Sequence, residues 1–118
     1  MSRSKVGHYN TAYNVKLGRN LPDSDIYCSS GLSVHVQSRH PDSVQYLPSI
    51  PAIIAAPDYI GCSRNEPNGM EYIKHLQDNV AVCIKLDGVR GDLYVATLYI
   101  VTPAKLQNRL NSGRIVRT

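Results

Sequence analysis

The amino-acid sequence predicts an α+β fold, with N-terminal helices followed by a four-stranded antiparallel β-meander and a C-terminal helix. Two apolar runs, Val80 to Leu86 and Leu93 to Val101, alternate like strands and are joined by a connector rich in Asp and Gly. Prolines end two helical stretches upstream of these runs, and turn-forming residues separate the strands. A chain of 118 residues can bury the core of one such domain without metals or disulfides.

The first part of the chain is polar and shows few signals of regular structure. We predict an N-terminal lead-in over residues 1–23 and a single domain over residues 24–118. Tyr9, Tyr13 and Leu17 are spaced at i, i+4 and i+8, which indicates a short helix or an arm packed on the body. A partly mobile lead-in is the equal alternative.

Two short helices are predicted ahead of the strands. The first runs from about Gly31 to Arg39 and ends at His40-Pro41, because the residue before a proline is disfavoured in the helical region. The second runs from Pro51 to Ala56, with proline in its first turn, where no hydrogen bond is lost. Its Ile53-Ile54 pair, in an apolar run, predicts burial against a sheet.

Four consecutive strands and a final helix follow. Dense turn signals at residues 64–69 and 77–79 divide the apolar segments. The predicted strands are Tyr59 to Cys62, Met70 to Leu76, Val80 to Leu86 and Leu93 to Val101. The last helix is predicted to span Ala104 to Leu110, with Thr102 as its N-cap and Gly113 as its terminator.

The apolar pattern of the last two strands predicts their register. If Cys83 lies opposite Thr97, the alternation of side chains sorts them into two faces. The face toward the core would carry Val82, Ile84, Ala96, Leu98 and Ile100. The other face would carry Cys83, Lys85, Thr97 and Tyr99. This second face therefore presents a cation, a hydroxyl and a phenol.

Composition limits the classes of function. The net charge of +4 and a pI near 9.1 favour a polyanionic partner such as nucleic acid. Three widely spaced cysteines form no Cys-x-x-Cys or Cys/His cluster, so we expect neither a disulfide framework nor a structural zinc. The start of the chain has no signal-peptide pattern, and no apolar run approaches the ~18 residues that cross a bilayer. We therefore expect a soluble, intracellular protein that does not act at a membrane.

Three separated motifs, in this order, resemble a known family. They are the helix and His40-Pro41 within Ser29 to Pro41, the segment Ile50 to Ile60, and Ala96 to Tyr99 followed by Lys105-Leu106. Together they resemble the phage-encoded branch of the barnase/EndoU/colicin/RelE-like (BECR) nuclease superfamily, over roughly residues 24–115. The resemblance implies helices followed by a four-stranded sheet, and cleavage of RNA without a metal.

The chemistry of such cleavage selects the candidate site residues. Attack of a 2′-hydroxyl on phosphorus needs a base, an acid for the leaving oxygen, and positive charge at the phosphate. We expect His35 and His40 to share the acid and base roles, Arg39 and Lys85 to bind phosphate, and Thr97 and Tyr99 to complete the site. The two histidines would diverge by roughly 140° on one helix. Either the helix ends before His40, or only one histidine reaches the phosphate.

Structural roles remain the alternatives for several of these residues. His35 would then be a hydrogen-bonded core histidine, His40 a C-terminal cap, and Arg39 a solvated surface charge.

At the level of function, we expect an endoribonuclease acting on RNA such as tRNA or mRNA in the cytoplasm (the host cytoplasm if phage-encoded), without cofactor or metal. An inhibitor or host protein is a further expected partner. The alternatives are a non-catalytic phage protein that binds a host protein or RNA through the same polar face, and a nucleic-acid-binding module that relies on its basic termini.

Overall fold

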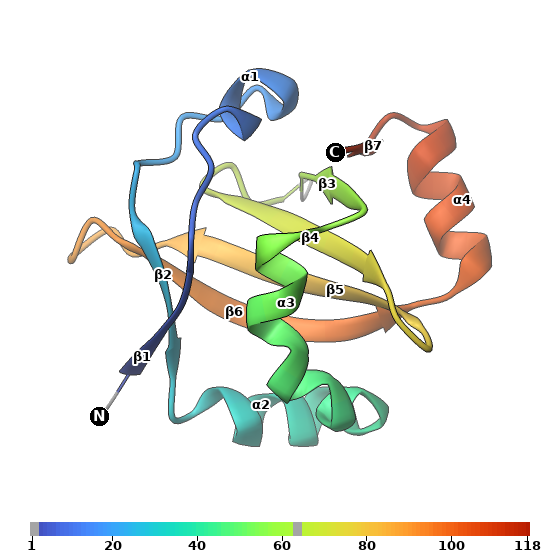
Figure 1. The fold of residues 1–118 in the computed structure, drawn as a ribbon, viewed down its shortest axis with the longest axis horizontal. Helices are drawn as coiled ribbons and strands as arrows, with labels where there is room; N and C mark the ends of the chain where they lie inside the picture. Colours follow the sequence, from blue (N-terminus) through green and yellow to red (C-terminus); the bar gives the residue numbers. More distant parts are fainter. Residues whose placement is uncertain (1–2, 63–64) are drawn as a thin grey trace.

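The computed structural model describes residues 3–62 and 65–118, which form one mixed β-sheet with helices on both sides (Figure 1). The strands are β1 (Arg3–His8), β2 (Asp25–Ser29), β3 (Tyr59–Gly61), β4 (Gly69–His75), β5 (Asn79–Leu86), β6 (Leu93–Val101) and β7 (Ile115–Arg117). The helices are α1 (Tyr13–Leu17), α2 (Leu32–Arg39), the 3-10 helix η1 (Pro41–Ser49), α3 (Ile50–Ala55) and α4 (Pro103–Asn111). The seven strands lie in the order β1-β2-β6-β5-β4-β3-β7.

The α+β class is confirmed, but the predicted layout is incomplete. The four consecutive antiparallel strands β3 to β6 form the middle of a seven-stranded sheet. The first element of the described residues is a strand, β1, instead of a helix, and β2 pairs with β6 in parallel, so the sheet is mixed. The sequence did not predict β1, because its residues are polar and its strand conformation depends on pairing with β2. A turn was predicted at residues 64–69, and of these residues Arg64 lies outside the part of the chain that the structure describes.

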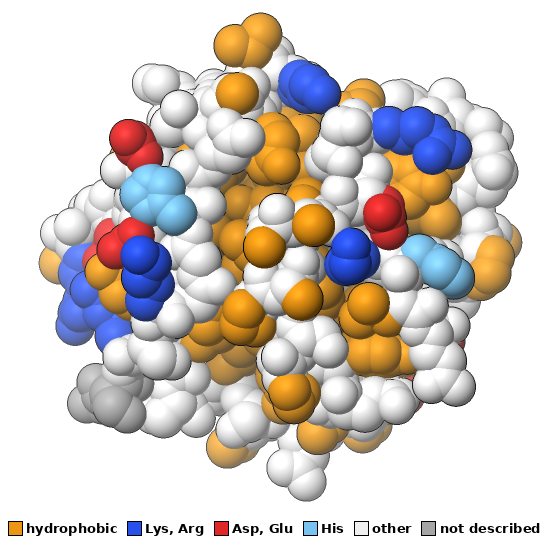
Figure 2. Space-filling model, viewed as in Figure 1, with side chains coloured by type: hydrophobic (Ala, Val, Ile, Leu, Met, Phe, Trp, Pro, Cys, Tyr) orange, Lys and Arg blue, Asp and Glu red, His pale blue; other side chains and the backbone are white. Residues whose placement is uncertain are grey.

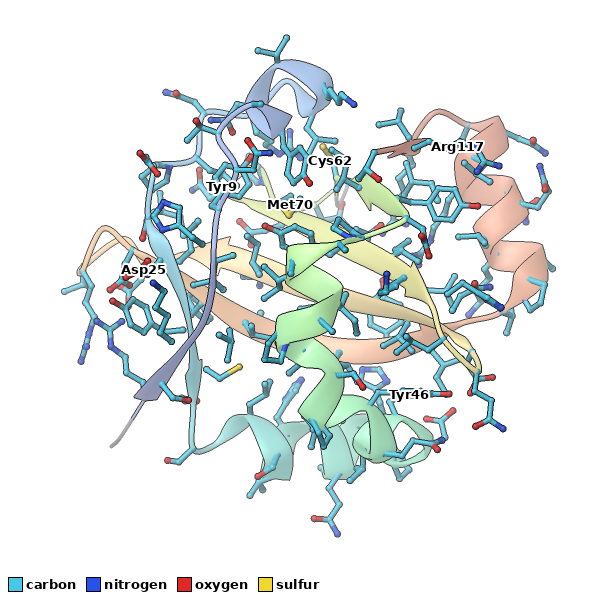
Figure 3. All side chains as sticks on the ribbon, in the orientation of Figure 1. Tyr9, Asp25, Tyr46, Cys62, Met70 and Arg117 are labelled. Atoms are coloured by element: carbon cyan, nitrogen blue, oxygen red, sulfur yellow. The ribbon has the colours of Figure 1, made fainter. Side chains whose placement is uncertain are left out.

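The main core lies between α3 and the sheet. Ile53 and Ile54 are buried, as their apolar surroundings predicted, against Val82, Ile84 and Leu98 of the central strands. Tyr9 and Met70, labelled in Figure 3, point into the same interior from the N-terminal segment and from β4. Figure 2 shows this side of the molecule, where hydrophobic side chains gather around α3 and many of the charged side chains lie to either side.

The opposite face of the sheet is only partly covered. Helix α4 packs its Leu106 and Leu110 on a smaller cluster at one end of this face. The buried members of that cluster are Ile73, Ala81, Val101 and Ile115. Thr102 caps α4 as predicted, its hydroxyl accepting a hydrogen bond from the Lys105 N–H at 3.3 Å. The rest of the face, which turns away from the viewer in Figure 1, stays open beside α4.

Helix α2 reaches the open face along the edge of β6. Strand β2 pairs with β6 only at Leu93 and Tyr94, which leaves the rest of that β6 edge to other partners. The hydroxyl of buried Ser43 in η1 accepts a hydrogen bond from the Ile100 N–H at 3.1 Å, so η1 satisfies part of this edge. Helix α2 precedes η1 and ends at Arg39, as the proline at 41 predicted.

The predicted register of β5 and β6 is confirmed from the Asn79–Val101 pair to the Cys83–Thr97 pair and is wrong beyond Cys83. Cys83 lies opposite Thr97, but a bulge follows, and Ile84 pairs with Val95. The extra residue moves Ala96 off the core face, where the sequence had placed it, and puts Val95, only 4% exposed, into the core. Alternation alone cannot reveal a bulge, because both Val95 and Ala96 are apolar.

Gly61 of β3 allows the close approach of β7. A Cβ at this position would lie 2.4 Å from Ile115 Cγ2 and 2.7 Å from the Arg114 carbonyl oxygen. We therefore expect Gly61→Ala to lower the free energy of unfolding by about 2 kcal/mol, because backbone atoms must shift to admit the methyl group. Urea denaturation measures the change. Gly88→Ala is the control, since no atom lies within 4 Å of its new methyl group, and equal stability of the two variants would contradict the expectation.

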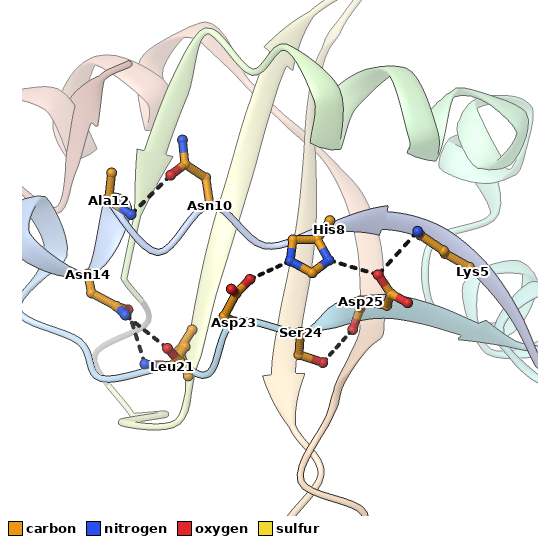
Figure 4. Close-up of polar contacts among 9 residues, drawn as sticks. All are labelled: Lys5, His8, Asn10, Ala12, Asn14, Leu21, Asp23, Ser24 and Asp25. Atoms are coloured by element: carbon orange, nitrogen blue, oxygen red, sulfur yellow. Dashed lines mark hydrogen bonds and ion pairs between the residues drawn. The ribbon is translucent and has the colours of Figure 1, made fainter.

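His8 joins β1 to β2 through two carboxylates (Figure 4). Its Nδ1 lies 2.7 Å from Asp25 Oδ1 and its Nε2 lies 2.5 Å from Asp23 Oδ1. Only the protonated imidazole donates from both nitrogens. The hydrogen bond with Asp25, followed by that with Asp23, raises the pKa of His8, whereas the His8 hydrogen bond lowers the pKa of Asp25.

This cluster should make stability depend on pH over the range in which His8 loses its proton. A raised pKa in the folded state gives stability that is complete below the unfolded pKa of about 6.5 and is lost as pH rises through the folded pKa. We expect the urea midpoint of the native chain to fall between about pH 5.5 and pH 8.5 by more than that of His8→Gln. Parallel pH profiles for the two proteins would contradict this role of His8.

Candidate functional site

A pocket of about 450 Å³ opens on the uncovered face of the sheet. Four elements, the turn before β4 and the segment after α4 line it. The polar residues at its wall are His35 from α2, Asn65 and Glu66 from the turn before β4, Glu71 from β4, Cys83 and Lys85 from β5, Thr97 and Tyr99 from β6, and Arg114. Four of the six residues that the sequence selected therefore meet in one place, although they are far apart in the chain.

His35 lies at the mouth of this pocket and contacts the last central strand. Its Nε2 is 3.2 Å from Thr97 Oγ1. Leu32 and Val36 on the same helix are buried and fix α2 on the body, whereas His35 itself is exposed. The structure thus places His35 on a surface that a ligand can reach, and the alternative of a core histidine is wrong.

His40 lies near His35 because the helix ends between them. Its backbone, at φ −139° and ψ 64°, has left the helical conformation. The two imidazole centroids are therefore only 6.5 Å apart. His40 also lies against the Tyr99 ring, with 5.5 Å between centroids, which holds the imidazole beside β6. The first of the two alternatives drawn from the sequence, a helix ending before His40, holds.

The two predicted phosphate ligands differ in position. Lys85 lines the pocket, and its Nζ lies 3.4 Å from Glu66 Oε2. Both side chains of that pair are substantially exposed, so the ion pair is weak and a phosphate can compete for the lysine. Arg39 is exposed at the end of α2 and is not part of the pocket wall.

A buried carboxylate on β4, Glu71, is not among the site residues predicted from the sequence. Glu71 is 1% exposed, and its Oε1 lies 3.5 Å from Arg109 Nη1 and 3.6 Å from Arg114 Nε. The Tyr99 hydroxyl donates to Glu71 Oε2 at 3.2 Å. The signal was present, because Glu71 stands inside the predicted strand Met70 to Leu76, whose neighbours are apolar. A carboxylate at such a position requires cationic partners.

Burial governs the acidity of the groups beside Glu71. Desolvation, followed by the charge of Glu71, raises the pKa of the Cys83 thiol to about 12, so this cysteine is not a thiolate nucleophile at neutral pH. Burial likewise raises the pKa of the Tyr99 phenol, with smaller effects from Cys83 and Glu71. Tyr99 therefore stays protonated and acts as a hydrogen-bond donor. Within residues 3–62 and 65–118, no group of three His, Cys, Asp or Glu side chains is arranged to hold a metal ion.

Imidazoles, hydroxyls and cations thus gather on the open sheet face of this small α+β domain. Residues 4–108 match the model of the family described as phage-Barnase-EndoU-ColicinE5/D-RelE like nuclease3, and the chain belongs to this family. The resemblance seen in the sequence is thereby confirmed. No curated protein and no solved structure matches the chain. Arg109 and Arg114 lie beyond the matched residues. No helix of the described chain is long and apolar enough to cross a membrane.

Proposed function

We propose that this protein is a metal-independent ribonuclease that cleaves RNA by attack of a 2′-hydroxyl on the adjacent phosphorus. The observation that carries the proposal is the His35–His40 pair beside a pocket lined by Lys85 and Thr97. Two imidazoles supply both proton transfers near neutral pH, and the cations supply charge for the phosphate. Membership of the nuclease family supports the same class of reaction.

The proton transfers fall to the two histidines. One imidazole removes the proton from the 2′-hydroxyl, the 2′-oxygen attacks phosphorus, and a 2′,3′-cyclic phosphate forms. The other imidazole gives its proton to the departing 5′-oxygen. Thr97 orients His35 through the 3.2 Å contact, and the Tyr99 ring positions His40.

Positive charge at the phosphate comes from Lys85 and Arg114. Both line the pocket, and the donors of a guanidinium match phosphate oxygens well. Arg114 is anchored by Glu71 and by a 3.1 Å hydrogen bond from its Nε to the Cys62 carbonyl, so its remaining nitrogens are held in one orientation. Arg39 stands at the end of α2, where it can contact a phosphate further along the strand.

The test uses a labelled RNA oligonucleotide in EDTA at about pH 7. We expect fragments that end in a 2′,3′-cyclic phosphate, formed without divalent cations. A matched oligonucleotide with 2′-deoxyribose at the cleaved position should resist cleavage there, because it lacks the nucleophile. Cleavage of the 2′-deoxy position, or activity that appears only with Mg²⁺, would contradict the proposal. RNA that stays intact but binds would favour the non-catalytic binding protein.

A further inference from the structure

A second pocket, of about 390 Å³, lies on the same open face and has no role in the proposed chemistry. Its wall is formed by β1, β2, β6 and the loop between β5 and β6. The residues that matter here are Arg3, Tyr27, Asp87, Arg90 and Tyr94. We call this surface the tyrosine pocket.

Strand register connects the tyrosine pocket to the candidate site. Tyr94 of β6 is paired with Tyr27 of β2 on one side and with Lys85 of β5 on the other. Paired residues project from the same face of a sheet, so both tyrosines lie on the face that carries Lys85 and Thr97. Thr97 lies three residue steps beyond Tyr94 along β6, or roughly 10 Å at the rise of a strand. A stacked nucleic-acid strand covers that distance with about three nucleotides.

Aromatic and guanidinium surfaces make up the tyrosine pocket. Tyr94 is 37% exposed, whereas the other seven tyrosines of the chain are buried or half-buried. The Arg3 guanidinium lies over the Tyr27 ring at 3.8 Å from its centroid. Flat aromatic and guanidinium surfaces bind unpaired nucleobases by stacking.

The charges of the tyrosine pocket are balanced, which favours a base over a phosphate. Arg3 Nη1 is paired with Asp92 Oδ2 at 2.7 Å. Backbone hydrogen bonds from Arg90 and Val89 lower the pKa of Asp87, with a smaller effect from the Arg90 charge, so Asp87 remains an anion beside Arg90. Such a balanced site gains little from another anion, but it offers stacking surface and hydrogen-bonding groups to a neutral base.

We propose that the tyrosine pocket is a binding subsite for an unpaired nucleobase of the RNA strand, a few nucleotides from the scissile phosphate. Tyr94 provides the stacking surface, and the Arg3–Tyr27 pair forms a second wall. This inference rests on the proposed function for its ligand, but it requires only binding of the strand. The subsite selects single-stranded RNA, because a paired base is not free to stack on a side chain.

The experiment measures binding of 2′-O-methyl oligonucleotides, which have no free 2′-hydroxyl and therefore cannot be cleaved by the proposed route. One oligonucleotide is intact, and a series carries a single abasic site at successive positions. With the native protein, we expect one position at which loss of the base weakens binding by about 5- to 150-fold, the usual effect of one base–aromatic stack. Tyr94→Ala should weaken binding of the intact strand similarly and should remove the difference between intact and abasic strands.

Tyr94→Phe is the matched control, because it keeps the ring and loses only the hydroxyl; it should bind like the native protein. Equal binding of all abasic strands by the native protein, or native affinity in Tyr94→Ala, would overturn the subsite even if the protein cleaves RNA. A Tyr94-dependent abasic effect in a protein without cleavage activity would support the subsite and refute the chemistry. Absence of any oligonucleotide binding would overturn both.

Discussion

His35→Ala is expected to reduce RNA cleavage at about pH 7 by roughly 10²- to 10⁴-fold, the usual contribution of one general acid or base. The imidazole is exposed and contacts Thr97 at the mouth of the pocket, so its removal takes away a proton carrier and leaves the core intact. The rate is measured on a labelled oligonucleotide in EDTA. His40→Ala should have an effect of similar size.

His75→Ala is the matched control for both variants. His75 is exposed on β4, at the far end of the sheet from the pocket, and its Nδ1 contacts Asn79. Its cleavage rate should stay close to that of the native protein, and all three variants should unfold at nearly native urea concentrations. A His35→Ala protein that is stable and fully active would remove His35 from the mechanism.

The pH profile of the cleavage rate distinguishes a mechanism in which two histidines share the acid and base roles from one in which a single histidine acts. With one imidazole neutral and the other protonated, the cleavage rate should rise and then fall with pH, as a bell-shaped curve. Loss of either histidine should remove one limb of that curve. A residual profile of unchanged shape in both variants would show that neither imidazole transfers a proton.

Glu71→Ala is expected to lower the free energy of unfolding by about 3 kcal/mol, because it leaves two arginines at the edge of the core without their carboxylate. Arg109 and Arg114 are 14% and 26% exposed, so water compensates only part of the loss. The Tyr99 hydroxyl also loses its acceptor. Urea denaturation at neutral pH measures the difference.

Glu66→Ala provides the comparison for this charge deletion. Glu66 forms a surface pair with Lys85, with side-chain exposures of 30% and 41%, and such pairs contribute at most about 1 kcal/mol. We therefore expect nearly native stability for Glu66→Ala. Equal stability of the two glutamate variants would show that burial does not determine how much Glu71 contributes to the free energy of unfolding.

Local patterns in the sequence determined the central strands, the end of α2 and the cap of α4. Alternating side chains define β5 and β6, Pro41 stops α2, and Thr102 begins α4. Each of these features depends on neighbours within a few residues, so the amino-acid order is sufficient to predict it. The same patterns supplied the cationic, hydroxyl-bearing face and the family resemblance.

Only the tertiary structure decided the rest of the sheet and of the site. Strand β1 is polar and depends on its pairing with β2, and a bulge opposite Ile84 decides which of Val95 and Ala96 is buried. Glu71 meets Arg109 and Arg114 only because α4 packs on the face of the sheet and the chain then returns to pair β7 with β3, next to β4. These contacts join residues that are distant in the chain. Pairing and packing between distant segments produce no local periodicity in the sequence, so they cannot be predicted from it.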